Sequence, residues 1–445
     1  MSGFVYEKPR NTPVVWEGDL VVVGGGVTGV FAAVRAARLG LRVAIVEKQN
    51  LFGGTATSGL VYMWHSLYDF DLKEQIISGL SEEVIDRLDK DGQVDKKPWA
   101  NPFNPMALIR VLDLLITEHR ITPFLHTMYA GISSEDGKRV QYVFVENKDG
   151  RGALKAEFFI DASGDGDLCR DLGLPRYSHG VMQPPSYCFF MKGNTTNDVI
   201  EWAVRKHGAE FGLEDDWGWY GEMPGQEGLS FRADNHVFGY DLSKAEDLSE
   251  AEIEGRRRAF MFEAMLRKYV SPEYRIVNIA STIGIRETVH YKTRFQANET
   301  DLLTGVRYED AVMQGTYGVD IHHEEDNGIT FKDLDGSLRI EYGKGCEAVE
   351  GNWRHDMGLD DNYARFYQVP FSVLVQEQYD NLIPVGRMIN ADKGAFGALR
   401  VMLNLNQLGE AAGVAAALSL NGGLPVRELS GIKVREVLRE GGSCL

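Results

Sequence analysis

Asp19-Leu-Val-Val-Val-Gly-Gly-Gly-Val-Thr-Gly29, followed by Val43-Ala-Ile-Val-Glu47, is the stretch of sequence that decides the fold. Its first apolar, valine-rich run ends in three glycines, which predicts a buried strand that turns sharply. The pattern over Val27–Leu39 predicts a helix, Gly40 is a typical C-cap, and a second apolar strand ends in an acid. This order of strand, glycine turn, helix and strand predicts the first unit of a parallel α/β sheet.

The glycines have the G-x-G-x-x-G spacing of dinucleotide-binding proteins. Gly24 allows the tight turn, Gly26 leaves room for a pyrophosphate because it has no Cβ, and Gly29 lets the helix pack close to the strand. Val27 and Thr28 begin the helix, where free N–H groups and the positive end of the helix dipole attract phosphates. We therefore expect these five residues to bind the cofactor.

An acid follows the second strand at the position where such proteins hold a ribose. Glu47 lies 23 residues after Gly24, and its carboxylate can accept hydrogen bonds from both ribose hydroxyls. The next residue, Lys48, is included in the expected cofactor site. Because the strand, the helix and the acid are all present, the motif is more specific than an isolated glycine pattern.

Composition narrows the class of protein. The chain has 445 residues, enough for two domains or for one large α/β domain with an inserted second one, and 44% of them are hydrophobic. A net charge of −18 argues against a nucleic-acid partner. Residues 1–19 contain no apolar leader, and no run of about 18 apolar residues occurs. We therefore expect a soluble cytoplasmic protein without membrane insertion.

The cysteines indicate no redox or metal centre. The four cysteines are Cys169, Cys188, Cys346 and Cys444, and no two of them have C-x-x-C spacing. Reduced thiols are expected, buried for the first three and in a loose tail for the last. No metal site is expected anywhere in the chain.

The remaining pattern predicts an FAD-type organisation in three parts. Local signals predict helices over 104–118, 249–269 and 404–419, a strand over 121–129 and a β-meander over 130–162. Residues 170–380 differ in composition from the rest of the chain, because they are richer in proline, tryptophan and acidic residues. The predicted fold is α/β: a Rossmann-like domain with a meander, formed by 1–169 and 381–445, with an inserted α+β substrate domain at 170–380.

Several glycine-rich segments follow the fingerprint along the chain. They are Gly53-Gly-Thr-Ala-Thr57, Asp161-Ala-Ser-Gly-Asp-Gly-Asp167, Gly284-Ile-Arg-Glu-Thr288, Asp320-Ile-His-His323, Val385-Gly-Arg387 and Gly409-x-x-x-Gly413. With this order and spacing the chain resembles the FAD-dependent oxidoreductase family of the glutathione-reductase-like flavoproteins, distantly related to succinate dehydrogenase and fumarate reductase flavoproteins. The resemblance covers nearly the full length.

The resemblance implies a role for each segment. The fingerprint and Glu47 would hold the ADP half of FAD. The Gly53–Thr57 loop would lie along the pyrophosphate and ribityl chain. A helix starting near Asn404 would point its N-terminus at the flavin ring. A helix N-terminus there stabilises the negative charge of reduced flavin. The other cofactor-binding residues that it implies are Gly53, Gly54, Thr55, Ala56, Gly164, Asp165, Gly386, Arg387, Asn404 and Leu405.

The chain also departs from its relatives. Residues 48–59 contain no histidine to tether a flavin, so FAD is expected to bind noncovalently. Many relatives carry Gly-Asp where this chain has Gly386-Arg387, which leaves the usual ribityl contact of that aspartate without a counterpart. There is no C-x-x-x-x-C and no second nucleotide fingerprint, so no resident NAD(P)H domain is expected.

The leading catalytic candidate is Arg400. Gly397-Ala-Leu-Arg-Val-Met-Leu-Asn404 resembles the fumarate reductase segment in which an arginine binds a substrate carboxylate and the final asparagine lies at the flavin. The resemblance implies that Arg400 clamps or polarises a substrate group, since a planar guanidinium suits anions. The alternative is an arginine that pairs with an acid or touches only the cofactor.

Histidines supply the other candidates. His290, His322 and His323 are possible proton acceptors beside a flavin. A metal site at His322-His323 is disfavoured, because adjacent residues of an extended chain point in different directions. His65 is equally compatible with a core or rim position. We further interpret Arg286 and Glu287 as a structural ion pair and Tyr187 as a packing residue.

These observations predict a flavoenzyme that moves two electrons, as hydride, between an organic small molecule and noncovalently bound FAD. Its external electron donor or acceptor is not indicated. The alternatives are a flavin-dependent monooxygenase that uses external NAD(P)H, and a non-enzymatic FAD-binding subunit.

Overall fold

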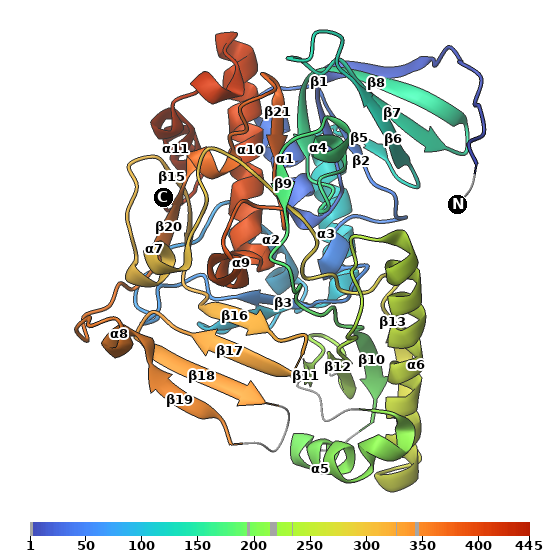
Figure 1. Cartoon of the computed structure of the whole chain (residues 1–445), viewed down its shortest axis with the longest axis vertical. Coiled ribbons are helices and arrows are strands. Elements are labelled where there is room, and N and C mark those ends of the chain that lie inside the picture. The colour runs from blue at the N-terminus through green and yellow to red at the C-terminus, as the bar shows by residue number, and fades with distance from the viewer. Residues whose placement is uncertain (1–2, 194–195, 214–219, 234, 326, 343–346) are drawn as a thin grey trace.

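The computed structural model describes residues 3–193, 196–213, 220–233, 235–325, 327–342 and 347–445 (Figure 1). Its main sheet has the order β5-β2-β1-β8-β7-β6, with β21 also paired to β8. The parallel strands are β1 (Val14–Val23), β2 (Val43–Val46), β5 (Thr122–Phe124), β8 (Gly150–Asp161) and β21 (Leu382–Pro384). The antiparallel meander is completed by β6 (Met128–Ser133) and β7 (Tyr142–Asn147). The predicted Rossmann-like α/β fold with a β-meander is confirmed.

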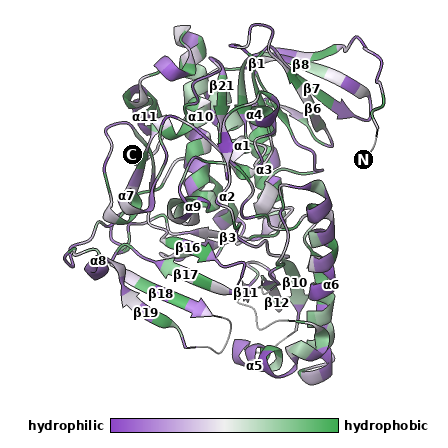
Figure 2. Cartoon of the chain, viewed as in Figure 1, coloured by the Kyte–Doolittle hydropathy of each residue, from purple (hydrophilic) through white to green (hydrophobic). Residues whose placement is uncertain are grey.

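Both faces of this sheet are covered, which explains why the last part of β1, Leu20–Val23, is continuously apolar rather than alternating. Leu20 and Val22 belong to one hydrophobic core, and Val21 and Val23 belong to another. Figure 2 shows the central strands as mostly hydrophobic, whereas the long helix α6 (Ala245–Tyr269) at the side of the molecule mixes both kinds of residue.

Helices α1 (Val27–Arg38) and α10 (Met402–Gly422) pack together on one face of the sheet. A Cβ at Gly409 would collide with the carbonyl oxygen of Thr28, and one at Gly413 with that of Ala32. The small residues of α10 therefore let two helix backbones approach closely. Arg35 of α1 and Glu410 of α10 form a buried ion pair across the contact. Helices α2 (Leu80–Lys90) and α3 (Pro105–Glu118) lie nearby.

Two antiparallel sheets lie in the half of the molecule away from the meander (Figure 1). The first contains β10 (Phe189–Lys192), β11 (Tyr220–Glu222), β12 (Leu229–Arg232) and β13 (Arg275–Ile279), with α5 (Asn197–His207) and α6 beside it. The second contains β16 (Val319–His322), β17 (Gly328–Lys332), β18 (Ser337–Tyr342) and β19 (Val349–Asn352). We propose the division 1–169, 170–380 and 381–445 as the domain organisation, supported by the return of β21 to β8.

Shorter elements connect these parts. The strands are β3 (Met63–His65), β4 (Ala100–Pro102), β9 (Arg176–Tyr177), β14 (His290–Tyr291), β15 (Ala311–Gly315) and β20 (Tyr367–Pro370). The α-helices are α4 (Asp167–Asp171), α7 (Glu299–Thr304), α8 (Trp353–Asp356), α9 (Lys393–Leu399) and α11 (Gly431–Glu440). The 3₁₀ helices are η1 (Gly54–Ala56), η2 (Gly208–Phe211), η3 (Phe371–Leu374) and η4 (Val426–Glu428). No helix among the described residues is both long enough and apolar enough to cross a membrane.

Most predicted elements are confirmed, with two local corrections. The strand predicted over 121–129 is two strands, β5 and β6, that pair with different neighbours. Cys444 does not lie in a loose tail, because its thiol contacts Ser78 and its carbonyl accepts a hydrogen bond from Gln314. Cys169 and Cys188 are buried as predicted, and Cys346 lies outside the described residues.

Candidate functional site

The glycine turn between β1 and α1 has the geometry that a phosphate-binding turn requires. Gly24 has a φ of 107°, and a Cβ there would collide with the carbonyl of Ala162. A Cβ at Gly29 would collide with the carbonyl of Gly24. At Gly26, by contrast, a Cβ would meet nothing within 4 Å, and no side chain caps the N-terminus of α1. Open space therefore lies beside unsatisfied N–H groups, which suits a pyrophosphate.

Glu47 closes the turn from the end of β2. One carboxylate oxygen accepts a hydrogen bond from the backbone N–H of Gly25 at 2.8 Å, and the other accepts from Gln49 at 2.8 Å. The residue is 8% exposed. Sequence reasoning assigned this carboxylate to a ribose alone, whereas the structure shows that it also fixes the glycine turn.

The predicted second glycine loop packs against the first. The N–H of Gly53 donates to the carbonyl of Gly25 at 2.8 Å, and Gly54 opens η1, which contains Thr55 and Ala56. Gly53 has a φ of 114°, a conformation that favours glycine. These contacts bring the Gly53–Ala56 loop to the N-terminus of α1.

The segments after β8 and β21 meet at the same edge, because the strands are parallel. The guanidinium of Arg387 pairs with Asp165 at 2.5 Å, and it fills the space that a Cβ at Gly164 would need. Burial alone would raise the pKa of Asp165, but the charges of Arg387 and Lys48 and a hydrogen bond from Thr288 hold it below its ordinary value. Lys48 is therefore close enough to belong to this site.

Two features of this segment leave room for a bound group. Gly386 has a φ of 122°, and a Cβ there would meet only the sulfur of Met388, at 4.0 Å. The Nε of Arg387 is buried and has no hydrogen-bond partner among the described residues. A polar ligand bound here would occupy the open space at Gly386, which we call the Gly386 cradle, and would accept a hydrogen bond from the Nε of Arg387.

The helix that follows, α10, presents its N-terminus beside this edge. Val401 is its N-cap, and no side chain caps it. The side-chain amide of Asn404 donates to the hydroxyl of Tyr367 at 3.0 Å and to the carbonyl of Ala398 at 3.0 Å. Both amide hydrogens are thus used within the protein. Leu405 is buried in the same first turn.

A polar cluster surrounds Asp320 immediately before α10. Arg400 pairs with the Asp320 carboxylate at 3.0 Å and also donates to its backbone carbonyl at 3.1 Å. The ring of His322 lies 3.2 Å from the other carboxylate oxygen, and the hydroxyl of Tyr317 donates to the carboxylate at 2.5 Å. His65 from β3 stacks on Tyr317 with ring centroids 4.1 Å apart. Residues from three separate regions therefore form one cluster.

The protonation states in this cluster follow from its burial. Burial alone would raise the pKa of Asp320, but the charges of Arg400 and His322 hold it well below its usual range. Burial is the main cause that lowers the pKa of His65 to about 4; Asp320 opposes this shift and Arg400 adds to it. At neutral pH the cluster therefore contains an anionic Asp320, a cationic Arg400 and a neutral His65.

The lowered pKa of His65 predicts a pH-dependent stability. Below about pH 6.5 the unfolded chain protonates this histidine, whereas the folded protein does not until about pH 4. Its contribution to the unfolding free energy is therefore lost as the pH falls through this range, by about 2 kcal/mol between pH 7 and pH 5. Urea unfolding at both pH values should show a smaller drop for His65→Asn than for the wild type. His355→Asn, which alters an exposed histidine, should behave as the wild type; equal drops in all three proteins would contradict the assignment.

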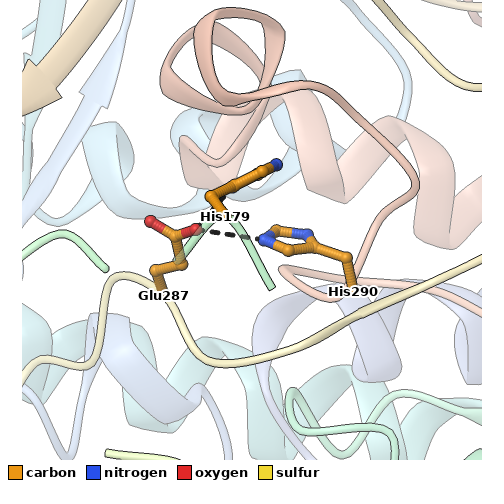
Figure 3. Close-up of side chains that lie close together, drawn as sticks. All are labelled: His179, Glu287 and His290. Carbon is orange, nitrogen blue, oxygen red and sulfur yellow. Dashed lines mark hydrogen bonds and ion pairs between the residues drawn. The ribbon is translucent and has the colours of Figure 1, made fainter. Parts of the chain in front are cut away.

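The other predicted histidines lie apart from Arg400. His323 faces away from His322 and contacts the hydroxyl of Thr330 at 2.8 Å. His290 lies beside Glu287, and this carboxylate is also bonded by His179 at 2.6 Å (Figure 3). The interpretation of Glu287 as the ion-pair partner of Arg286 is corrected, because its two oxygens serve the two histidines and the N–H of Gln183.

Gln183 joins the two histidine groups. Its N–H donates to Glu287 at 3.1 Å, and its side-chain oxygen accepts from the N–H of His322 at 3.1 Å. Its Nε2 is buried without a partner among the described residues. Sequence reasoning missed Gln183, His179 and Tyr317, because no local motif marks them. Tyr187 packs in the core as interpreted.

Residues 19–438 match the family model described as FAD dependent oxidoreductase. This chain belongs to that family. FAD is therefore its cofactor, and the glycine turn, the Gly53 loop and the Gly386 cradle fit that group. The residue-by-residue contacts with FAD remain proposals.

Individual relatives match only short segments. A dihydrolipoyl dehydrogenase of Trypanosoma brucei brucei is 41% identical over 67 residues, 14% of this chain and 14% of that protein. A ferredoxin–NADP reductase of Rickettsia typhi is 27% identical over 101 residues, 23% of this chain and 26% of that protein. The chain thus matches a minor part of the length of these curated relatives.

Among solved structures, a geranylgeranyl bacteriochlorophyll reductase-like protein from Thermoplasma acidophilum is similar over 96% of this chain and 84% of its own. The TM-score is 0.46 and the sequence identity is 11%.

Proposed function

We propose that this protein oxidises or reduces a small organic molecule by moving hydride between it and noncovalently bound FAD. The observation that carries the proposal is the cluster of Arg400, Asp320 and His65 directly before the uncapped N-terminus of α10. When bound, FAD supplies the two-electron redox chemistry. The protein supplies the groups that position the substrate and take its proton.

The charge balance of the cluster indicates the substrate class. The resemblance to fumarate reductases implies that Arg400 clamps a carboxylate, but its charge is balanced by Asp320 at 3.0 Å. A buried ion pair of this kind has little free charge with which to hold an anion. We therefore propose a neutral substrate that carries a hydroxyl group, held by hydrogen bonds rather than by a salt bridge.

His65 is the proposed proton acceptor. No hydrogen bond to its ring is found within the described residues, and although the surrounding protein desolvates the ring, part of the residue stays exposed, so a substrate hydroxyl can reach it. As hydride leaves the carbon of an alcohol, the hydroxyl proton must be accepted by a base. The neutral imidazole takes this proton, and the nearby Asp320 carboxylate stabilises the resulting positive charge. Arg400 and Tyr317 hold Asp320 in place for this role.

A substrate screen under nitrogen tests the function. Matched neutral alcohols and hydroxy acids are added to the oxidised protein, and bleaching of the flavin absorbance is recorded. The proposal expects bleaching by a neutral alcohol without NAD(P)H. Bleaching only when NAD(P)H is present would indicate a monooxygenase, and the absence of bleaching with every donor would indicate a binding subunit.

The absence of a histidine in residues 48–59 predicts how FAD is held. FAD is expected to co-purify with the protein and to be released completely on denaturation, because only noncovalent contacts hold it. Acid precipitation followed by absorbance of the supernatant measures the released flavin. Yellow colour retained in the pellet would contradict noncovalent binding.

A further inference from the structure

His179, Glu287 and His290 form a compact group apart from the Asp320 cluster (Figure 3). Nδ1 of His179 lies 2.6 Å and Nε2 of His290 lies 3.2 Å from the same oxygen of Glu287, and the three atoms lie within 4.8 Å of one another. Glu287 and His290 are fully buried, and the side chain of His179 is 9% exposed. Three potential metal ligands therefore converge on one buried point.

The outer nitrogens of both rings fix the tautomers. Nε2 of His179 lies 2.9 Å from the carbonyl oxygen of Ala391, and Nδ1 of His290 lies 2.9 Å from that of Ile389. A carbonyl oxygen only accepts hydrogen bonds, so each of these nitrogens carries a hydrogen. In the neutral rings the inner nitrogens then present lone pairs. Both lone pairs face Glu287, which is itself an acceptor.

Three donor atoms that converge in this way can be satisfied together by a single divalent cation. The pattern also matches known metal sites, in which each ligating histidine donates its outer N–H to a carbonyl and the ligating carboxylate is itself hydrogen-bonded. Here the N–H of Gln183 donates to the second oxygen of Glu287.

We propose that Nδ1 of His179, Nε2 of His290 and Oε1 of Glu287 bind a divalent transition-metal ion. Two imidazoles and one carboxylate suit such ions, and water completes the coordination. The site was not expected from the sequence, because its ligands come from two segments separated by more than a hundred residues.

The position of the site indicates a structural role. Its outer hydrogen bonds hold the carbonyls of Ile389 and Ala391, in the segment that runs from Gly386 to Arg400. The ring of His290 also contacts Phe396 of α9, with centroids 4.6 Å apart. The ion would thus hold in position the segment of chain that connects the Gly386 cradle to the Asp320 cluster. This inference does not depend on the proposed hydride transfer.

Zinc binding to the wild-type holoprotein tests the site first. The protein is stripped with a chelator, incubated with Zn²⁺ and desalted, and its metal content is measured by mass spectrometry. About one zinc per chain is expected, and X-ray absorption at the zinc edge should show two imidazoles with first-shell distances of about 2.0–2.2 Å. A protein that retains no zinc, or a zinc shell without imidazole, would overturn the proposal.

Variants locate the ion. Glu287→Gln and His290→Gln should each weaken zinc binding by more than the 10- to 100-fold typical of losing an outer-shell partner. His355→Gln, which changes an exposed histidine paired with Asp361, should retain zinc as the wild type does. FAD content and near-ultraviolet circular dichroism check folding. Undiminished zinc in folded Glu287→Gln and His290→Gln would place the ion elsewhere and refute the site; if both variants unfold, the wild-type absorption spectrum decides.

Discussion

Replacing Arg400 by lysine is expected to slow flavin reduction by substrate about 10- to 150-fold while leaving FAD bound. Arg400 donates to both the carboxylate and the backbone carbonyl of Asp320. Both contacts come from a single guanidinium nitrogen, Nη2; lysine keeps the charge but lacks the rigid planar group that places this nitrogen between the two oxygens. A charge-assisted hydrogen bond contributes about 1.5–3 kcal/mol, which corresponds to this range of rates. Anaerobic single-turnover reduction measures the step directly.

A matched control variant shows whether the effect depends on the position of Arg400 or follows from replacing any paired arginine by lysine. Arg339 pairs with Glu341 at 2.6 Å on the exposed part of β18, so Arg339→Lys makes the same chemical change away from the cluster. It should reduce as fast as the wild type. If Arg400→Lys loses its flavin, Arg400 acts on the cofactor; if it keeps FAD and reduces at the wild-type rate, Arg400 has no part in the reaction.

Glu47→Ala is expected to weaken FAD binding about 10- to 150-fold. The substitution removes the proposed charged acceptor for the ribose hydroxyls, a loss of about 1.5–3 kcal/mol. It also removes the hydrogen bonds from the N–H groups of Gly25 and Gln49. The variant should therefore lose stability even without FAD, which can be measured by thermal unfolding of the apoprotein.

These two effects can be distinguished. Glu47→Gln keeps one carbonyl oxygen for Gly25, so it should preserve more of the turn than alanine does while still weakening the ribose contact. FAD affinity is measured by flavin fluorescence titration of each apoprotein. A variant that unfolds at lower temperature but binds FAD with wild-type affinity would confine Glu47 to the turn and remove it from the ribose.

Local sequence signals predicted the cofactor half of the molecule well. The glycine fingerprint, the meander turns and the small residues of α10 each specify a local geometry, and the structure confirms α1, α3, α10 and β6–β8. The error at 121–129 has a physical cause. An apolar run does not reveal where a chain changes partners, and here β5 pairs with β2 while β6 pairs with β7.

The chemistry around Arg400 was less predictable, because its partners are distant in the sequence. The pairing with Asp320 joins residues 80 positions apart, and it changes the expected carboxylate clamp into a balanced ion pair. The burial of Arg258 was likewise not predictable from the sequence. Its guanidinium is buried and bonds Asn235 across the fold, a contact that no helical periodicity predicts.

The close contact of α1 and α10 fixes the position of the two helices relative to each other along their axes. Thr28 faces Gly409 and Ala32 faces Gly413, so the helices run in the same direction and their N-termini share one end. From this register α10 begins about 9 Å before α1 along their common direction. The separation of the two electropositive helix ends is thus set by backbone contact and by the buried Arg35–Glu410 ion pair between the helices. A bulkier residue at Gly409 would collide with the backbone of Thr28 and shift that spacing, so we expect a position buried between two helices to influence how well the proposed cofactor site fits FAD.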